Sequence, residues 1–193
     1  VGVSVALVGL AMGETEKTGS DFDLGAGITV ALDGTAGAGS AVLQATAEEL
    51  AGGVLTASAG NMAQGLSYVA RSRGIQATIV VPEHAPQTKI DAIERYGGRV
   101  IKVPYDEWWT IVVEGRYEGA RGLFVHPADD ERVMAGNGTI GLELLEDLPD
   151  VDAVLVPYGG GGLVTGIASV TKTLRPEAKV YAVEPETGAP FTA

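Results

Sequence analysis

The sequence predicts an α/β protein in which parallel sheets are covered by helices, and two patterns indicate this fold class. Short apolar runs alternate with longer segments of helical periodicity from residue 54 almost to the end. The short runs are nearly continuous in apolar residues, as is typical of strands buried on both faces. The chain has 193 residues and is 46% hydrophobic, which is enough for one sizeable core or two modest ones. We therefore expect αβα layers in one or two domains.

The elements can be placed in order along the chain. Residues 1–45 are rich in glycine, and the apolar stretches 3–10 and 28–32 are their candidate strands. Beyond residue 46 the apolar runs predict strands at 54–57, 78–81, 99–103, 123–125, 153–156 and 180–183. The periodic segments between them predict helices at 61–73, 86–96, 106–118, 131–147 and 163–174.

Composition excludes several classes of partner. The chain carries 25 acidic and 13 basic residues, for a formal charge of −12. Nucleic acids and anionic membranes bind basic surfaces, so we expect neither as a partner. The chain has no cysteine, which agrees with a cytoplasmic location and leaves no thiolate for catalysis or metal binding. The apolar start has no basic region before it and is interpreted as a strand rather than a signal peptide.

A run of four glycines, Gly159–Gly162, follows the apolar run 151–156 and precedes a helical pattern. Unblocked backbone N–H groups and the positive end of a helix dipole would converge at this turn. Glycines also let the main chain approach a ligand more closely than any Cβ permits. The pattern favours an anion site, most naturally for a phosphate, over an ordinary flexible turn, which needs fewer glycines.

Two further loops follow predicted strands, where ligands bind in such sheets. In the first, Ser58 and Asn61 precede a helix and could hold a carboxylate or a ring hydroxyl. The alternative is that one of them is a helix N-cap. In the second, His126 is either a base or, as is more common for a lone histidine, a hydrogen-bonded structural residue.

Other residues have simpler interpretations. Trp108 and Trp109 are expected to pack in the core or at a domain interface rather than to stack on a ligand. The charged residues near the end of helix 131–147 are expected to form a solvated face. The sequence has no nucleophile elbow, no phosphate-loop lysine signature and no zinc-binding helix. A nucleotide-binding domain remains an alternative, because Glu184 follows the strand after the glycine run.

Taken together, these motifs resemble those of the fold-type II pyridoxal-phosphate enzymes, in particular the threonine/serine dehydratases and serine racemases. The resemblance covers about residues 46–190. It is carried by the Ser-x-Gly-Asn loop 56–65, the segment 77–82 with Lys89, the Val-His-Pro stretch 125–130, the segment 136–143, the glycine loop 156–163 and the segment 183–186.

The resemblance implies a fold, a cofactor and site residues. It implies two three-layer αβα domains, with 46–136 as the small domain, 137–193 as an incomplete large domain and 1–45 as an N-terminal part of the latter. The cofactor would be pyridoxal 5′-phosphate, with its phosphate on Gly159, Gly160, Gly161 and Gly162 and its ring hydroxyl on Asn61. The substrate carboxylate would bind at Ser58, Ala59 and Gly60.

The chain departs from the family pattern at several positions. Asp23 stands where the family has its Schiff-base lysine, and a carboxylate cannot form that bond. Lys17 lies six residues too early to take the role. Ala59 stands where the racemases place a serine base, which favours elimination over racemisation. Pro190 stands where the family's cation site has an acidic residue, so we expect no metal site.

By resemblance, the expected function is that of an ammonia-lyase that converts L-threonine or L-serine into a 2-oxo acid and ammonia. The catalytic lysine is not identified, so a non-catalytic ligand-binding or regulatory module on the same scaffold is the alternative. We expect a small amino acid as the partner, and association into a homo-oligomer is left open.

Overall fold

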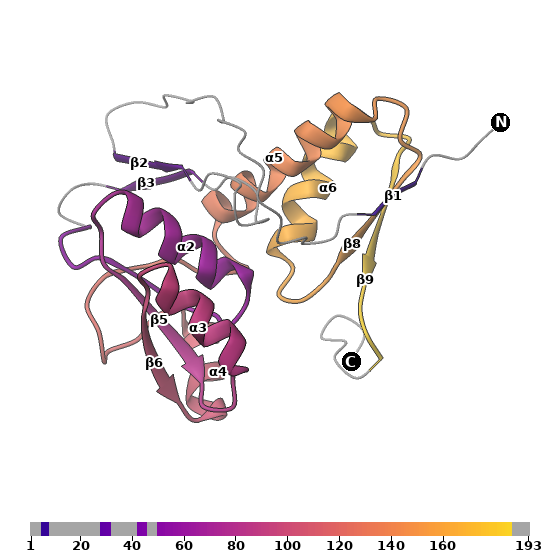
Figure 1. The fold of residues 1–193 in the computed structure, drawn as a ribbon. Helices are drawn as coiled ribbons and strands as arrows, with labels where there is room; N and C mark the ends of the chain where they lie inside the picture. The colour runs from indigo at the N-terminus through magenta and orange to yellow at the C-terminus, as the bar shows by residue number, and fades with distance from the viewer. Residues whose placement is uncertain (1–4, 8–27, 32–41, 46–49, 187–193) are drawn as a thin grey trace.

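The structure is a computed structural model that describes residues 5–7, 28–31, 42–45 and 50–186, with side chains for 50–186. Two groups of elements are visible in Figure 1. One contains a four-stranded sheet with α2, α3 and α4. The other contains a three-stranded sheet with α5 and α6. Parallel strands joined through helices confirm the predicted α/β class.

The four-stranded sheet has the order β6-β5-β4-β7 and is parallel throughout. Its strands are β4 (Val54–Ala57), β5 (Ala77–Pro82), β6 (Arg99–Val103) and β7 (Leu123–Phe124). Alternate side chains of β5 enter two different cores. Ile79 and Val81 pack with Leu66 and Ile93 of α2 (Asn61–Ser72) and α3 (Gln87–Arg95), whereas Val80 packs with residues of α4 (Tyr105–Glu114). Helices therefore cover both faces.

The second sheet has the parallel order β1-β8-β9, formed by β1 (Val5–Leu7), β8 (Ala153–Pro157) and β9 (Lys179–Val183). Its core contains Val154 and Val156 of β8 and Ile167 of α6 (Gly162–Leu174). Helix α5 (Glu131–Asp147) lies directly against α6. A Cβ on Gly166 would overlap the Met134 carbonyl oxygen, so glycine is what allows the two helices to approach this closely.

Most predicted elements occur where the sequence places them, and β4, β6 and α5 have the predicted bounds. Helix α4 ends at Glu114 rather than at 118, because Gly115 turns into the left-handed region with φ +63°. The strand β3 (Val42–Ala45) was not predicted; it pairs antiparallel with β2 (Ile28–Ala31). The predicted domain boundary after residue 136 falls inside α5, and the division into domains stays a prediction.

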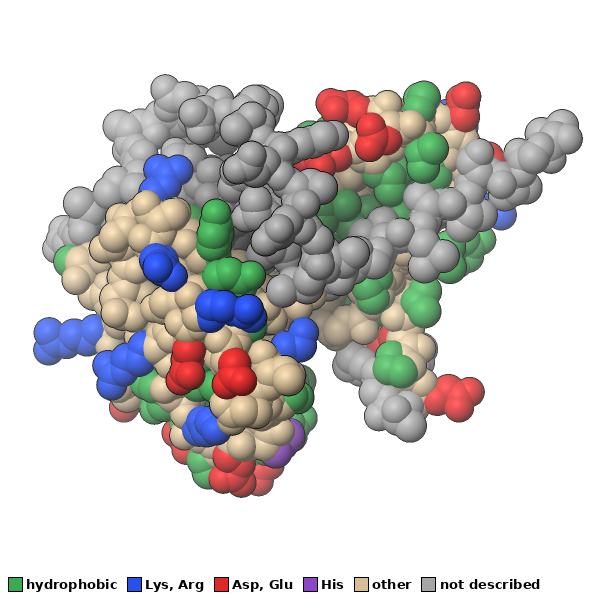
Figure 2. Space-filling view, viewed as in Figure 1, with side chains coloured by type: hydrophobic (Ala, Val, Ile, Leu, Met, Phe, Trp, Pro, Cys, Tyr) green, Lys and Arg blue, Asp and Glu red, His purple; other side chains and the backbone are tan. Residues whose placement is uncertain are grey.

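Charged side chains are unevenly distributed over the surface. Figure 2 shows Lys and Arg side chains spread over the group that contains α2 and α3. Several acidic side chains gather near the C-terminal end of α5, where Glu143, Glu146 and Asp147 are exposed as predicted. Among the helices that the structure describes, none is long and apolar enough to cross a membrane.

Candidate functional site

The three loops singled out in the sequence open onto one cavity of about 1400 Å³. Residues 57–62 line it from the end of β4, residues 126–129 from the end of β7, and residues 157–163 from the end of β8. Each loop lies at the carboxyl end of a parallel strand, where such sheets bind ligands. The cavity is larger than most small-molecule sites, so it has room for a cofactor together with a substrate.

The first loop leads into α2 without a side-chain cap. Gly60 is the N-cap residue of α2, and no described side chain accepts a hydrogen bond from the first turn. The Ser58 hydroxyl instead accepts a hydrogen bond from the Gly60 N–H, at 3.3 Å. The alternative interpretation of Ser58 or Asn61 as an N-cap is therefore wrong. The first-turn N–H groups of α2 remain available to a ligand at the cavity wall.

The glycine loop leads into α6 in the same way. Gly161 is the N-cap residue, with φ +96°, and none of the described side chains caps the helix. A Cβ on Gly160 would lie 2.9 Å from the Ala128 Cβ, and one on Gly162 would lie 2.9 Å from the Pro127 carbonyl oxygen. The loop therefore needs glycine to fit against residues 127 and 128. Its backbone N–H groups and the start of the helix dipole are the features expected of an anion site, and that role stays a prediction.

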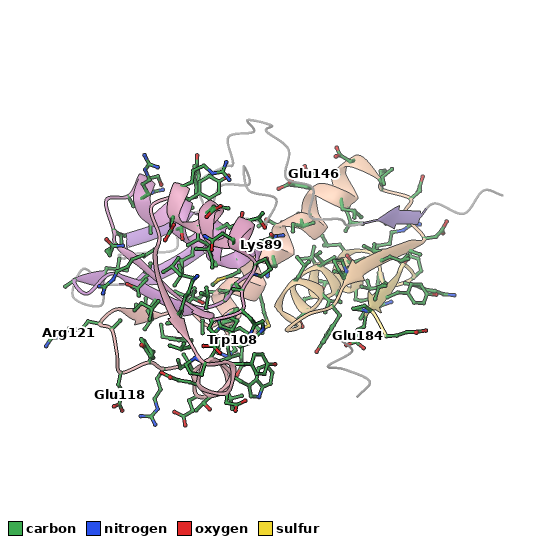
Figure 3. All side chains as sticks on the ribbon, turned by 60° about the horizontal axis from the view of Figure 1, so that its bottom comes forward. Lys89, Trp108, Glu118, Arg121, Glu146 and Glu184 are labelled. Carbon is green, nitrogen blue, oxygen red and sulfur yellow. The ribbon has the colours of Figure 1, made fainter. Side chains whose placement is uncertain are left out.

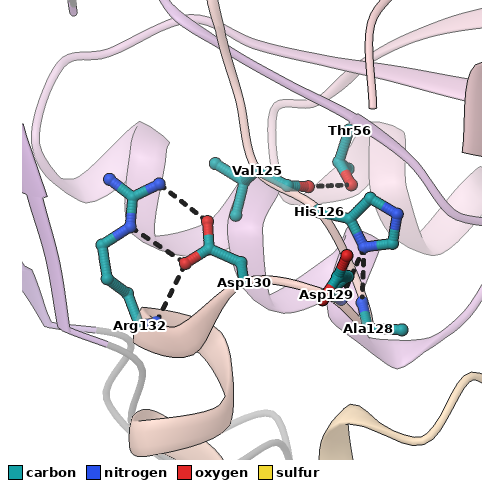
Figure 4. Close-up of polar contacts among 7 residues, drawn as sticks. All are labelled: Thr56, Val125, His126, Ala128, Asp129, Asp130 and Arg132. Atoms are coloured by element: carbon teal, nitrogen blue, oxygen red, sulfur yellow. Dashed lines mark hydrogen bonds and ion pairs between the residues drawn. The ribbon is translucent and has the colours of Figure 1, made fainter. Parts of the chain in front are cut away.

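His126 organises the loop against which the glycines pack (Figure 4). Its Nε2 lies 2.8 Å from the Val112 carbonyl oxygen, which can only accept, so Nε2 carries the proton. Its Nδ1 accepts the backbone N–H groups of Ala128 and Asp129, at 3.1 and 2.6 Å. Both ring nitrogens are thus occupied, which supports the structural interpretation of His126 over a role as base.

The start of α5 shows what a capped helix looks like in this molecule. The Asp130 carboxylate accepts hydrogen bonds from the backbone N–H and the guanidinium of Arg132, each at 2.9 Å. Burial raises the pKa of Asp130, but hydrogen bonds and charge from Arg132 outweigh it and hold that pKa below 3.8. Helix α5 therefore has a side-chain cap, whereas α2 and α6, like α3 and α4, have none among the described residues.

An aromatic wall closes another side of the cavity. Tyr105, Trp108 and Trp109 of α4 form it, with ring centroids 5.8 and 6.2 Å apart. Trp108 packs on the core as predicted, and Figure 3 shows its position. Trp109 is 51% exposed, so it does not pack in the core, and the predicted alternative for it, packing at a domain interface, stays a prediction. Its exposed ring lines the cavity, and sequence patterns could not reveal that this cavity lies beside α4.

Tyr158 and Asn137 also line the cavity, although sequence reasoning did not select them. The Tyr158 hydroxyl would lie 3.2 Å from a Cβ on Gly161, so the ring covers the glycine loop. Asn137 belongs to α5 and lies near Gly166 of α6. The only available signal for Tyr158 was its place directly before the four glycines.

Several predicted positions lie outside the described residues, namely Asp23, Lys17 and Pro190. Within the described part of the chain, no lysine lines the cavity. Nor do the residues described include a group of three or more His, Asp or Glu side chains that could hold a metal ion. The roles predicted for Ser58, Ala59, Gly60, Asn61 and the four glycines stay predictions, now with all eight residues on one cavity.

Comparison with known proteins identifies relatives of the chain. The profile of a family described as "Pyridoxal-phosphate dependent enzyme" matches residues 35–193. A serine racemase of Arabidopsis thaliana is 43% identical over 157 residues, which are 78% of this chain and 46% of that protein. An L-threonine ammonia-lyase of Geobacter sulfurreducens is 48% identical over 140 residues, which are 71% of this chain and 34% of that protein.

A solved structure of a threonine deaminase is also similar to this chain. The processed form of threonine deaminase isoform 2 from Solanum lycopersicum superposes with a TM-score of 0.64 and 41% identity, covering 75% of this chain and 40% of that one. The chain thus spans less than half the length of the curated relatives reported above.

Proposed function

Because the chain belongs to the pyridoxal-phosphate dependent enzyme family, whose cofactor is pyridoxal phosphate, we propose that it forms the cofactor- and substrate-binding part of an ammonia-lyase. The substrate would be a hydroxy amino acid such as L-threonine or L-serine. The single observation that supports this proposal best is that α2 and α6 both begin at the same cavity with their first N–H groups uncapped by any described side chain.

The two helix starts suit two different anions. The loop Gly159–Gly162 has no side chains of its own, so its backbone N–H groups could approach a bulky, doubly charged group such as the cofactor phosphate. The start of α2 has the Ser58 hydroxyl beside it and fits the smaller carboxylate of an amino acid. Asn61, the first residue of α2, would donate to the ring hydroxyl of the cofactor. Together these three contacts would hold the phosphate and the ring hydroxyl of the cofactor and the carboxylate of the substrate.

The protein's part in the chemistry would be to orient the reactants. Bound pyridoxal phosphate supplies an electron sink for the substrate Cα. The α2 start would hold the carboxylate, while the aromatic wall of α4 would exclude water from one side of the cavity. A lysine that would accept the Cα proton is not found among the described residues that line the cavity.

Ala59 supports elimination rather than racemisation. Racemisation needs a second group that exchanges a proton on the other face of Cα. The Ala59 methyl group lines the cavity and cannot exchange a proton. The relatives include serine racemases as well as threonine ammonia-lyases, so this residue is our reason for choosing between them.

The proposal is tested by cofactor binding followed by product analysis. Pyridoxal phosphate is titrated into the protein while tryptophan fluorescence is recorded, because Trp108 and Trp109 line the cavity. L-threonine and L-serine are then added, and 2-oxo acid and D-serine are measured separately. We expect saturable binding and 2-oxo acid without D-serine. Failure to bind pyridoxal phosphate would overturn the proposal.

One observation favours a second candidate, a non-catalytic module that binds the same ligands. No described lysine lines the cavity, so covalent attachment of the cofactor has no support within that part of the chain. The module predicts that pyridoxal phosphate binds but is not fixed by borohydride, and that neither amino acid yields a product. Borohydride-stable attachment together with 2-oxo acid formation would exclude it.

A further inference from the structure

Lys89 contacts Asn61 from outside the cavity. Its Nζ lies 3.3 Å from the Asn61 Oδ1, and the contact joins α3 to the first residue of α2, 28 residues away in sequence. Both side chains are partly buried, and Asn61 lines the cavity whereas Lys89 does not. The ammonium group therefore contacts a cavity-lining residue without lining the cavity itself.

This contact determines which way the amide faces. A lysine ammonium has only donors, so the amide atom beside it must be the carbonyl oxygen. The Asn61 NH₂ group then projects away from Lys89 and can serve only an acceptor. A positively charged donor also polarises the amide, which makes the NH₂ group a stronger donor than that of a free asparagine.

The charge of Lys89 is not taken up by an acidic partner in the described part of the chain. No carboxylate there lies within ion-pair distance of the Nζ atom. Asp91, an acidic residue of the same helix, instead accepts a hydrogen bond from Gln87 at 2.7 Å. The positive charge therefore acts mainly on Asn61 and on any negative oxygen beyond it.

We propose that Lys89 is a positioning residue that holds the Asn61 amide with its NH₂ group toward the cavity, where it binds a ring oxygen carrying negative charge. The inference rests on the proposed function, because the ring oxygen is the hydroxyl group of pyridoxal phosphate. Lys89 itself does not touch the ligand. It acts through Asn61 and thereby selects a hydroxypyridine over a ring without that group.

The test compares two ligands on matched variants. The first ligand is 4′-deoxypyridoxine phosphate, which has the ring hydroxyl but no aldehyde, so that binding is non-covalent. The second is its analogue without the ring hydroxyl. The variants are Lys89→Met, Lys89→Arg, Asn61→Ala and the double variant Lys89→Met/Asn61→Ala. Lys102→Met, which removes an exposed lysine of β6, is the matched control. Urea unfolding of each variant establishes that it is folded.

Loss of a charge-assisted contact should weaken binding of the hydroxyl ligand to Lys89→Met about tenfold. Binding of the ligand without the hydroxyl, and of inorganic phosphate, should not change. Lys89→Arg should restore most of the affinity, because it keeps both charge and donors. In the Asn61→Ala background, Lys89→Met should weaken binding no further. If Lys89 acts through Asn61, the effects of the two substitutions on the binding free energy do not add.

Either of two binding results would overturn the inference alone. One is equal affinity of the hydroxyl ligand for Lys89→Met and the unaltered chain, and the other is that Lys89→Met loses as much affinity in the Asn61→Ala background as in the unaltered chain. Borohydride treatment with pyridoxal phosphate that attaches the pyridoxyl group to Lys89 would also overturn it, because the amine would then react rather than hold Asn61. If the unaltered chain binds neither pyridine ligand, the proposed function fails and this inference fails with it.

Discussion

At the scale of single residues, Gly162 determines whether the glycine loop fits its neighbour. A Cβ there would lie 2.9 Å from the Pro127 carbonyl oxygen and 3.2 Å from the Ala128 Cα, and both are backbone atoms that cannot rotate away. Gly159, three residues earlier in the same loop, has nothing within 4 Å of the equivalent position. The two glycines therefore differ in packing although they belong to one motif.

We predict that Gly162→Ala lowers the free energy of unfolding by about 1–3 kcal/mol, as is usual when an extra methyl group is forced into a packed site. Gly159→Ala should change it by no more than about 0.5 kcal/mol, because its methyl group would occupy open space. Urea unfolding of both variants provides the measurement. Equal stability of the two would mean that the loops do not pack as described.

His126 is the second residue whose environment makes a sharp prediction. It uses Nε2–H to bind the Val112 oxygen and Nδ1 to accept two backbone N–H groups. We expect His126→Ala to cost about 2–3 kcal/mol of stability, since it leaves these three backbone groups without their partner. His84→Ala, at an exposed histidine, is the control and should cost little. Nitrogen NMR that found the proton on Nδ1 would contradict the assignment.

At the scale of elements, Asp130 links helix stability to pH. Its carboxylate caps α5 and its pKa lies below the ordinary value of 3.8. A group whose folded pKa is lowered stabilises the protein above its unfolded pKa, and this contribution is lost as the pH falls through the folded pKa. The cap should therefore be fully effective at pH 7 and fail only in acid below about pH 4.

Asp130→Ala is expected to lower the free energy of unfolding by about 1 kcal/mol at pH 7, because the N-cap acceptor is lost. Asp130→Asn keeps an acceptor, so its cost should be smaller, and the difference between it and the unaltered chain should shrink as the pH falls below 4. Urea titrations at several pH values check this trend. A difference that grew in acid would contradict the lowered pKa.

Strands and helices were predicted well where their own residues show the apolar run or the helical periodicity of that element. β5 is apolar except for Thr78 and is entirely buried, and α5 has both a capping aspartate and a helical period. The strand β3 was not predicted because its place depends on pairing with β2. Residues 180–183 of β9 are also apolar, yet most of the strand is exposed, and among the described strands it has a neighbour on one edge only.

For the candidate site, cavity-lining residues that stand in local motifs were predictable, and the residues that contact them from behind were not. The glycines and Asn61 stand in local motifs, and their loops meet at one cavity. The contacts of Lys89 with Asn61 and of Pro127 with Gly162 join segments that are 28 and 35 residues apart, where no local pattern extends. Tertiary packing alone brings such pairs together.

At the scale of the whole molecule, β9 carries the most exposed large apolar side chains among the residues of the second sheet whose side chains are described. Among the described strands, β9 lies at the edge of the order β1-β8-β9, and Tyr181 and Val183 are 48% and 47% exposed. An edge strand presents unpaired N–H and C=O groups, and nearby apolar side chains add a reason to associate. This strand is therefore the surface through which we expect two copies of the chain to meet.

We predict that the chain self-associates in a concentration-dependent manner and that Tyr181→Lys/Val183→Lys weakens association at least about tenfold, because burial of two apolar side chains is lost and like charges are brought together. Leu174→Lys, at a residue of α6 that is 59% exposed, is the matched control and should associate like the unaltered chain. Sedimentation velocity over a range of concentrations measures the effect. A monomer at every concentration would refute the prediction, and equal association of the β9 variant would move the interface to another surface.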